Sequence, residues 1–431
     1  MKILIIGVGG VGQSVAMIIK RAGAEGQWAE KVVLSDYNLA RAEAVAKLVD
    51  DPRFVPEKIN AKDPASIKAV VEKHGITWIM NAVEPSFNPY IFDTALECGV
   101  GYLDCAMTLG EAHPEKPFEL VNVKLGDAQF AQFDKWKEKG CLALVGSGVE
   151  PGMADVFAKF AEKYLFDEID EVNVRDGDSY HFPEGVEGGA FGFSVWTTIE
   201  ECLNPPVIYE KARKNEPGKG WFCTENFSEP EIFDFPGGIG PVEVINVEHE
   251  EVLLVPREID CNRVTFKYGV PRELRQLLLN LREVGMDEAK KTIKVGDSEI
   301  APRDFLVKVI PSPLDTAAQM LGKGCAGTWV TGKKDGLTRS VYLYQIADNQ
   351  ECVKKYGTNS VVAQTAVVPV IMMELVAKGI WKGAGVFGPE SFDPDPVMER
   401  LAKYEFPAAM EEKNSEYATK LQQEALLKIM K

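Results

Sequence analysis

The chain has 431 residues, of which 45% are hydrophobic and 26% are charged. This length and composition are typical of a globular protein with two or three domains, and they exclude a long disordered chain, a collagen-like chain and a coiled rod. The 65 acidic residues outnumber the 48 basic residues by 17. The resulting negative field would repel nucleic acid.

Cysteine and histidine usage argues against a structural metal site. The eight cysteines are scattered with no pair at Cys-x-x-Cys spacing, and there are only four histidines. The apolar run at residues 2–6 stops at Gly7 without the longer core and cleavage site of a signal peptide, and polar residues interrupt the apolar stretch at 361–377. We therefore expect a cytoplasmic protein with reduced thiols and no metal, which contacts neither a membrane nor nucleic acid.

The first 150 residues alternate between two kinds of segment. Short apolar runs typical of buried parallel strands occupy residues 2–6, 32–35, 54–59, 76–80, 100–103 and 141–145. Segments with helical spacing lie between them, at residues 11–21, 39–49, 64–73, 90–98 and 127–139. Six strands that alternate with helices predict an α/β fold with a doubly wound parallel sheet of the Rossmann type.

The pattern changes after Gly152. A helix is expected at residues 154–164, and antiparallel strands at residues 169–174, 242–247, 251–255 and 263–268. Glycine and proline are frequent at residues 182–192 and 215–240, which favours long loops or an active-site wall. One more strand at 338–346 and helices at 360–378 and 417–430 follow. These segments predict a second domain of the α+β class with a mixed sheet.

The strongest chemical signal is Gly7-Val8-Gly9-Gly10-Val11-Gly12, between the first strand and the first helix. Gly7 permits the tight turn, Gly9 lets the backbone approach a pyrophosphate, and Gly12 allows close packing of the helix on the sheet. The helix N-terminus attracts negative charge. The segment predicts a dinucleotide-binding site that includes Gly10 and Val11.

Asp36 ends the second strand, 24 residues after Gly12, where a carboxylate can accept hydrogen bonds from an adenosine ribose. This position favours NAD, because a 2′-phosphate would meet a like charge, while the nearby Arg41 leaves NADP possible. The alternative interpretation is that Asp36 caps the following helix. Asp63, at the end of the third strand, is a second candidate for the adenine pocket and equally a candidate helix cap.

Further polar residues follow the later strands of the predicted sheet. Asn81, Ala82, Val83 and Glu84 follow the fourth strand, Asp104 ends the fifth, and the segment 146–152 with Glu150 follows the sixth. In open α/β sheets the ligand crevice lies at the carboxyl ends of the strands. We therefore expect these segments beside the nicotinamide or the substrate, although the segment 146–152 would serve equally as a turn between domains.

Taken in order, these motifs resemble the saccharopine dehydrogenase-like oxidoreductases, a family that includes saccharopine dehydrogenases, lysine 6-dehydrogenase and carboxynorspermidine dehydrogenase. The resemblance spans most of the chain, and the nearest similarity is to lysine 6-dehydrogenase. It depends on the glycine fingerprint and on Asn81-Ala82, Tyr102-Leu103-Asp104, Gly148-Val149-Glu150-Pro151-Gly152, Phe193-Ser194-Val195-Trp196, Pro302-Arg303-Asp304, Lys333-Lys334-Asp335-Gly336 and the late segment from Gly379 to Glu390.

The resemblance implies a division of the chain into three parts. Residues 1–150 form the dinucleotide-binding Rossmann domain, residues 151–357 the substrate-binding and dimerisation domain, and residues 358–431 a segment that returns to the Rossmann domain and ends in a terminal helix. A homodimer is expected. The chemistry implied is hydride transfer between the nicotinamide of NAD, or of NADP, and a C–N bond of a lysine-derived amino acid or its imine.

The resemblance also directs the choice of catalytic candidates. Proton transfer needs a group of suitable pKa, and the candidates are His249, Glu250, Glu84 and Glu150, with Asp104 a further option. The alternative for His249 is a solvated position in the acidic run 248–251. Trp196 resembles a family aromatic beside the substrate, where an indole face would hold a cationic amine, and the alternative is an ordinary core tryptophan.

The substrate stays open within the family, because Cys105-Ala106-Met107 and the glycine-rich and proline-rich region around residues 180–240 depart from the family pattern. An amino-acid carboxylate would need an arginine fork, for which Arg175, Arg257 and Arg263 are candidates. A polyamine would be better served by acidic residues near Trp196, namely Asp176, Asp178, Glu184 and Glu187. The alternatives are a carboxynorspermidine dehydrogenase, a homospermidine synthase-type enzyme that retains its NAD, and a non-catalytic NAD-binding sensor.

Overall fold

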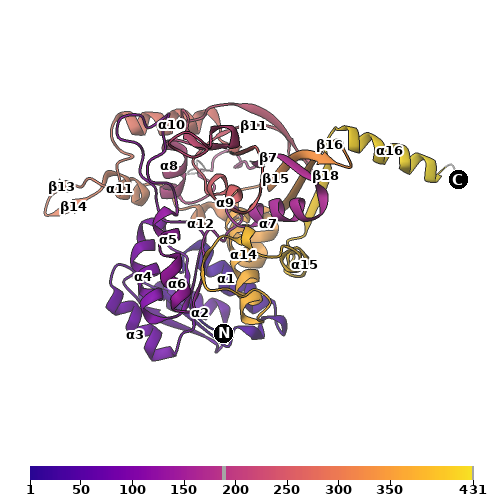
Figure 1. Cartoon of the computed structure of the whole chain (residues 1–431). Coiled ribbons are helices and arrows are strands. Elements are labelled where there is room, and N and C mark those ends of the chain that lie inside the picture. The colour runs from indigo at the N-terminus through magenta and orange to yellow at the C-terminus, as the bar shows by residue number, and fades with distance from the viewer. Residues whose placement is uncertain (187–190, 430–431) are drawn as a thin grey trace.

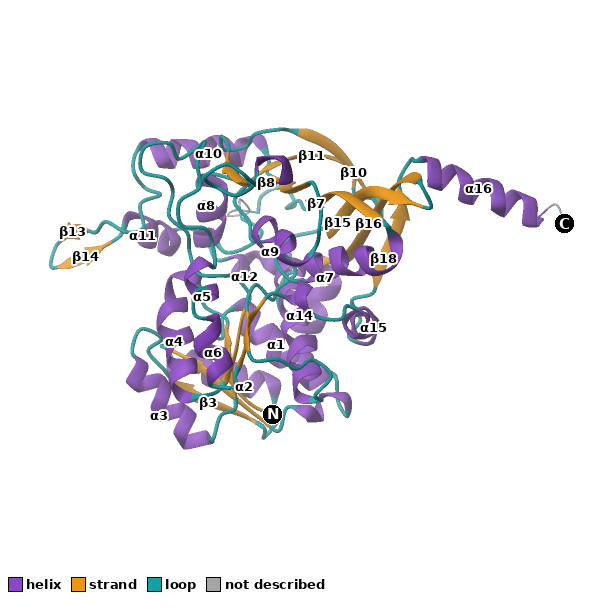
Figure 2. Cartoon of the chain, viewed as in Figure 1, coloured by secondary structure: helices purple, strands orange, loops and turns teal. Residues whose placement is uncertain are grey.

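The computed structural model describes residues 1–186 and 191–429. Two sheets with their helices build the molecule, one in the lower half of the view and one in the upper half (Figure 1). Helices cover both faces of the lower sheet (Figure 2). The terminal helix α16 (Glu416–Ile429) extends away from the upper half (Figure 1).

The lower sheet confirms the predicted Rossmann fold. All of its pairings are parallel, and the strand order is β17-β6-β5-β4-β1-β2-β3. Because the order reverses between β1 and β4, the ligand crevice is expected at the carboxyl end of β1. The strands are β1 (Lys2–Ile6), β2 (Lys31–Asp36), β3 (Phe54–Lys58), β4 (Trp78–Asn81), β5 (Gly101–Asp104), β6 (Leu142–Leu144) and β17 (Gly385–Phe387).

The helices between these strands follow the sequence closely. A left-handed glycine ends both α3 and α4, at Gly75 and Gly99, as expected where a side chain would be strained. The segment expected as one helix at 127–139 forms two short helices. The helices are α1 (Gly10–Arg21), α2 (Leu39–Val49), α3 (Pro64–His74), α4 (Asn88–Cys98), α5 (Asp127–Phe130) and α6 (Phe133–Glu138).

The upper sheet is mixed, as predicted, and has nine strands. Its main path runs β10-β11-β12-β7-β15-β16-β18, and β8 and β9 extend it beside β12. The strands are β7 (Glu168–Asp178), β8 (Val207–Glu210), β9 (Trp221–Cys223), β10 (Glu231–Phe235), β11 (Gly240–Asn246), β12 (Arg263–Gly269), β15 (Lys323–Lys334), β16 (Leu337–Asp348) and β18 (Ala408–Glu412).

The remaining elements connect the two sheets or border the upper one. A small hairpin, β13 (Ile293–Val295) with β14 (Ser298–Ile300), projects from the upper half (Figure 1). The helices are α7 (Met153–Phe160), α8 (Val195–Leu203), α9 (Glu251–Glu258), α10 (Arg272–Glu283), α11 (Pro302–Val309), α12 (Pro313–Thr316), α13 (Asn349–Tyr356), α14 (Ser360–Ala377) and α15 (Asp395–Lys403).

Three expectations for the upper half are wrong. The segment 251–255 is not a strand but the start of α9, where Val252, Leu253, Leu254 and Val255 are all buried. A short, fully buried apolar run has no alternation that would distinguish strand from helix. Strands β7 and β12 also pair in parallel rather than antiparallel. Part of the region 215–240 forms β9 and β10 rather than loop.

The C-terminal segment joins both sheets. Strand β17 pairs with β6 at the edge of the lower sheet, as the resemblance implied, whereas β18 pairs with β16 of the upper sheet. Helix α14 packs against α1 and contributes many residues to the largest core. Among the described residues α14 is the one helix long and apolar enough to cross a membrane, and 83% of that window is buried inside the protein.

Substitution of a core residue of α14 should test its role in joining the two halves. Ile371 is completely buried, whereas Ile380, just beyond the helix, is 46% exposed. We expect Ile371→Ala to lower the free energy of unfolding by about 2 to 5 kcal/mol, because it leaves a cavity in the core. The control Ile380→Ala should cost less than about 1 kcal/mol. Equal losses in chemical denaturation would contradict the assigned core.

Candidate active site

The glycine loop at the carboxyl end of β1 has the shape that the fingerprint requires. Gly7 has a φ of +93°, and a Cβ there would lie 2.5 Å from Val83 Cγ1. A Cβ at Gly12 would overlap the carbonyl oxygen of Gly7, whereas one at Gly9 would meet nothing within 4 Å. Gly12 therefore permits the helix packing, and Gly9 leaves an open surface.

The N-terminus of α1 follows this open surface directly. Within the described chain no side chain caps α1, and its first turn, which contains Gly10 and Val11, has no acidic residue. Unpaired N–H groups at a helix N-terminus attract a pyrophosphate. The loop and the helix therefore fit the phosphates of a dinucleotide.

Asp36 lies beside the same loop, as predicted. Its carboxylate accepts hydrogen bonds from the backbone N–H groups of Val8 at 3.3 Å and Asn38 at 3.0 Å. The side chain of Asn38 caps α2, so Asp36 is not the cap of that helix. The guanidinium of Arg41 donates to Val8 O and to Gln13 Oε1, both at 2.8 Å. A carboxylate and a guanidinium thus both border the expected ribose position.

The residues after β4 shape the other side of the glycine loop. Asn81 is 1% exposed, and its Oδ1 accepts from the N–H of Val83 at 3.1 Å. Ala82 and Val83 lie directly against Gly7. Asp63, by contrast, is exposed and caps α3 by accepting from the N–H of Ala65 at 3.0 Å. Asp63 is therefore a helix cap, as the alternative interpretation proposed, and its role in the adenine pocket stays a prediction.

Asp104 lies at the end of β5 inside a closed hydrogen-bond network. Its carboxylate accepts from Tyr102 OH at 2.9 Å, Gln129 Nε2 at 2.6 Å and the N–H of Gly146 at 2.8 Å. Burial raises its pKa to about 7, although these three donors oppose the shift. The Asp104 carboxylate thus receives three hydrogen bonds from the protein itself. The geometry favours Asp104 as a residue that positions the loop after β6.

A cleft of about 540 Å³ lies at the carboxyl ends of β4 and β5, between the lower sheet and helices α8 and α11. This volume suits a small-molecule ligand. A narrow pocket adjoins it, and the two share Pro85, Leu109, Trp196, Glu200 and Glu248. The residues that line only the narrow pocket include Ala106, Met107, Leu125, Thr197, Glu201 and Glu250.

The narrow pocket beside the cleft, of about 30 Å³, is lined by several carboxyl groups, which form an acidic inner wall. Glu201 on α8 and Glu248 before α9 both have a pKa raised to about 8, because burial disfavours their charged form. Burial also raises the pKa of Glu250, whose Oε1 accepts from the N–H of Met107 at 3.1 Å. The wall is thus acidic and largely desolvated.

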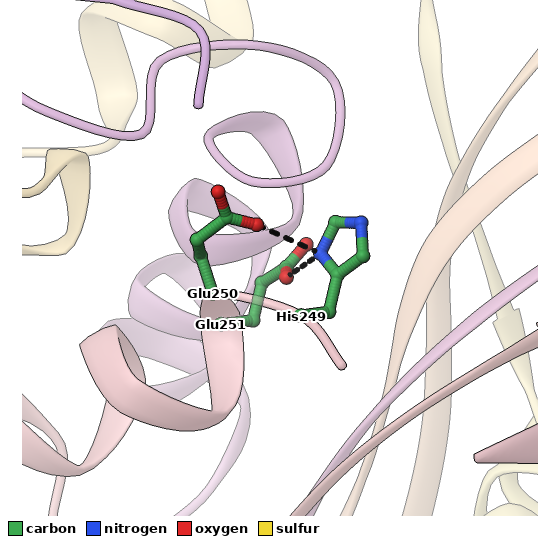
Figure 3. A group of neighbouring side chains, drawn as sticks. All are labelled: His249, Glu250 and Glu251. Carbon is green, nitrogen blue, oxygen red and sulfur yellow. Dashed lines mark hydrogen bonds and ion pairs between the residues drawn. The ribbon is translucent and has the colours of Figure 1, made fainter. Parts of the chain in front are cut away.

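His249 lies behind this wall and is 5% exposed, so the alternative of a solvated position in the acidic run is wrong. Its Nδ1 contacts Glu251 Oε2 at 2.5 Å and Glu250 Oε2 at 3.5 Å (Figure 3). Its Nε2 lies 3.8 Å from Glu201 Oε1, and its ring stacks on Phe266. Burial acts to lower its pKa, but the three carboxylates outweigh burial and raise the pKa to about 10. His249 is therefore an imidazolium at neutral pH.

The three residues in Figure 3 also have the types of side chain that ligate metals. One ligand atom of each of His249, Glu250 and Glu251 lies within 4.8 Å of the other two. The close Nδ1–Oε2 contact is that of a charge-assisted hydrogen bond. The arrangement is accounted for by the imidazolium and its carboxylates without a metal ligand set.

Glu150 extends the acidic group towards the loop after β6. Burial, Asp176 and Glu251 together raise its pKa well above the ordinary range. Its buried Oε1 accepts no hydrogen bond among the described residues, as is also the case for Asp155 Oδ1 and Glu251 Oε1. Asp176 on β7 has a pKa raised to about 7 by burial and by Asp178. Glu150 and Asp176 thus form a largely buried cluster of carboxyl groups with Glu251, in which protons or a cation must compensate the charge, and the catalytic role of Glu150 stays a prediction.

Glu84 lies at the edge of the site, before Pro85, which lines the cleft. Burial, and then the carboxylate of Asp304, raise its pKa. Glu184 is exposed and Glu187 lies outside the described residues. Of the described acidic residues that the sequence associated with a polyamine, Asp176 and Asp178 are partly buried on β7, and Asp176 lies near Glu150 and Glu251.

Trp196 lines the cleft and is 5% exposed. The guanidinium of Arg303 lies over its ring, with Cζ 4.9 Å from the ring centroid. The three arginines suggested by the sequence lie elsewhere: Arg175 pairs with Glu231, Arg263 with Glu229, and Arg257 lies over the ring of Phe130. Among the described residues, Arg303 is the arginine that lines the cleft.

Sequence reasoning missed Glu200, Glu201 and Glu248 as residues of the cleft. Trp196 and Glu200 are four residues apart, so helical spacing places them on the same face of α8. That signal was present in the sequence. The approach of residue 248 to this face depends on folding across 44 residues, which no local pattern indicates.

Comparisons with known proteins agree with this geometry. Residues 3–144 match the saccharopine dehydrogenase NADP binding domain, and residues 148–406 match the saccharopine dehydrogenase C-terminal domain. The structure of apo saccharopine dehydrogenase (L-Glu forming) from Saccharomyces cerevisiae is similar with a TM-score of 0.63 and 15% identity, covering 96% of this chain and 100% of that one.

Two curated relatives match nearly the full length of the chain. Carboxynorspermidine synthase of Vibrio cholerae serotype O1 is 28% identical over 418 residues, which cover 93% of this chain and 94% of that protein. Carboxyaminopropylagmatine dehydrogenase of Synechocystis sp. is 28% identical over 411 residues, with 94% and 96% covered. The chain belongs to the saccharopine dehydrogenase family and is an NAD(P)-dependent oxidoreductase.

The glycine loop allows cofactor binding and folding to be separated. We expect Gly9→Ala to weaken dinucleotide binding at least about tenfold while the melting temperature is unchanged, because its Cβ has free space in the protein. Gly12→Ala should lower the melting temperature as well, because its Cβ would overlap Gly7. Nucleotide titration and thermal melting measure both effects. Unchanged affinity of the Gly9 variant would refute the assigned pyrophosphate position.

The raised pKa of His249 predicts a specific dependence of stability on pH. Its folded pKa of about 10 exceeds the ordinary value of 6.5, so the stabilisation is fully present below pH 6.5 and is lost as the pH rises towards 10. The destabilisation caused by His249→Gln should therefore shrink between pH 6.5 and pH 9.5. Melting curves measure it, with the exposed His181→Gln as the control. A difference independent of pH would contradict the imidazolium.

Proposed function

We propose that the protein interconverts an imine and a secondary amine in a carboxylated polyamine, using NAD or NADP. The observation that supports this substrate class is the acidic lining of the narrow pocket of about 30 Å³ that adjoins the cleft, formed by Glu201, Glu248 and Glu250, of which Glu248 also lines the cleft itself. Buried carboxyl groups beside a cleft favour a cationic ligand, which compensates their charge. A substrate with several ammonium groups fits this wall better than one with a single amine.

The chemistry proposed for the chain's own residues is positioning and proton transfer. When bound, the nicotinamide cofactor supplies or accepts the hydride at the carbon next to nitrogen. Glu201 and Glu248, with pKa values of about 8, hold a proton near neutral pH and can exchange it with the amine nitrogen. The imidazolium of His249 faces Glu201 from the protein side and influences its charge state.

The names of the curated relatives favour the polyamine alternative over the lysine-derived substrate that the sequence placed first. The relatives are named for carboxynorspermidine and carboxyaminopropylagmatine. The acidic wall is consistent with this order, because a lysine-derived amino acid brings fewer ammonium groups to it. A homodimer and a cytoplasmic location stay predictions of the sequence.

A substrate panel tests the proposal. Purified protein would be incubated with NAD or NADP and, separately, with carboxynorspermidine, saccharopine, L-lysine and unsubstituted polyamines, and the absorbance of reduced nicotinamide would be followed. We expect turnover with carboxynorspermidine and not with L-lysine, and a preference for NAD because of Asp36. Turnover with saccharopine or L-lysine alone would refute the substrate class. Bound nucleotide without net reduction would favour the homospermidine synthase-type alternative, and no turnover at all the sensor.

A further inference from the structure

We infer that Arg303 and Glu200 form a subsite for the α-amino-acid end of the substrate, with Arg303 binding the carboxylate and Glu200 the ammonium. This inference rests on the proposed function and assigns to two residues the recognition that distinguishes a carboxylated amine from a plain one. Both side chains line the cleft and bond to each other across it, from α11 and α8.

The guanidinium of Arg303 is held firmly and is 6% exposed. Its Nε donates to the carbonyl oxygen of Asp287 at 2.7 Å, its Nη1 donates to Glu200 Oε2, and its plane lies over Trp196. Its Nη2 has no hydrogen-bond acceptor among the described residues. A fixed guanidinium with one unused donor nitrogen, Nη2, can still donate to a carboxylate.

Glu200 supplies the opposite charge in the same place. Its Oε1 accepts from Asn204 Nδ2 at 2.8 Å, and the same amide nitrogen donates to Glu248 Oε2 at 2.7 Å. Asn204 therefore connects Glu200 to the acidic inner wall. The paired arginine and glutamate place a positive charge beside a negative one, which complements an α-carboxylate next to an α-ammonium.

The other cations that line the cleft are less suited to this role. Lys290 is 74% exposed and lies 3.7 Å from Glu111, and Lys124 pairs with Asp127 at 2.9 Å. An exposed lysine contributes a mobile, hydrated charge, whereas the buried fork of Arg303 is preorganised. The site is therefore divided into a neutral, zwitterion-binding part at Arg303 and Glu200 in the cleft and an acidic part at Glu201, Glu248 and Glu250 in the adjoining narrow pocket.

The test compares carboxynorspermidine with norspermidine, which has the same chain without the carboxyl group. Their affinities are measured by calorimetry on the enzyme loaded with reduced nicotinamide, with which neither amine reacts. We expect the wild type to prefer carboxynorspermidine at least about tenfold, and Arg303→Gln to remove this preference while leaving norspermidine binding within about twofold. Arg303→Lys should retain part of the preference, because it keeps the charge and loses the fork.

Glu200→Gln should affect the two ligands differently from Arg303→Gln, because the ammonium group that Glu200 binds is present in both carboxynorspermidine and norspermidine. It should weaken both ligands by a similar factor and leave their ratio unchanged. Arg275→Gln removes a partly buried arginine that pairs with Glu243 outside the cleft, and it should change neither affinity. Unaltered nucleotide binding shows that each variant is folded.

The outcomes separate the two proposals. If the wild type has no preference, or if Arg303→Gln weakens both amines equally, the subsite is refuted even when turnover with carboxynorspermidine supports the proposed function. If the wild type turns over none of the panel and binds neither amine, the proposed function fails, and the subsite fails with it.

Discussion

The burial of many carboxyl groups around a single imidazolium is the constraint on which the site depends. Glu150, Asp155, Asp176, Glu201 and Glu251 reach one region from different elements of the fold, and His249 is the cation at its centre. Unpaired buried charge is costly, so the protein must retain protons or bind a cation there. The raised pKa values of these carboxyl groups mean that they retain protons, which avoids unpaired buried charge without a cationic ligand. The same arrangement makes the region receptive to an amine.

The two sheets contribute opposite chemistry to the crevice. The lower sheet supplies backbone N–H groups at α1 and an open glycine surface, which suit an anionic pyrophosphate. The upper half supplies the carboxyl groups of α8 and of the segment just before α9, which suit a cationic substrate. Because α14 packs on α1 and β18 pairs with β16, the C-terminal segment fixes these two halves together. Cofactor and substrate can therefore approach one another from differently charged walls.

The fold of the lower sheet was predictable because its signals are local. The strand, the glycine loop, the helix and Asp36 follow one another within 36 residues, and Trp196 lies on an apolar helix whose face also carries Glu200. The solvated alternative for His249 was wrong because four consecutive polar residues indicate solvent, whereas its burial and its stacking on Phe266 depend on contacts distant in sequence. The arginines predicted to bind the substrate carboxylate were wrong for the same reason, since the partner of each arginine is determined by tertiary packing. Local patterns thus located the cofactor loop more accurately than the substrate cleft.

Charge compensation also links substrate binding to protonation. An ammonium group beside Glu201 and Glu248 favours their charged forms and lowers pKa values that burial has raised to about 8. Binding of the amine near neutral pH then releases protons from the wall, and affinity rises with pH until these groups are ionised. The pair of Arg303 and Glu200 is already neutral as a unit and takes part in this exchange much less. The zwitterion-binding part of the cleft therefore determines which amine is held, whereas the acidic part couples its binding to proton transfer.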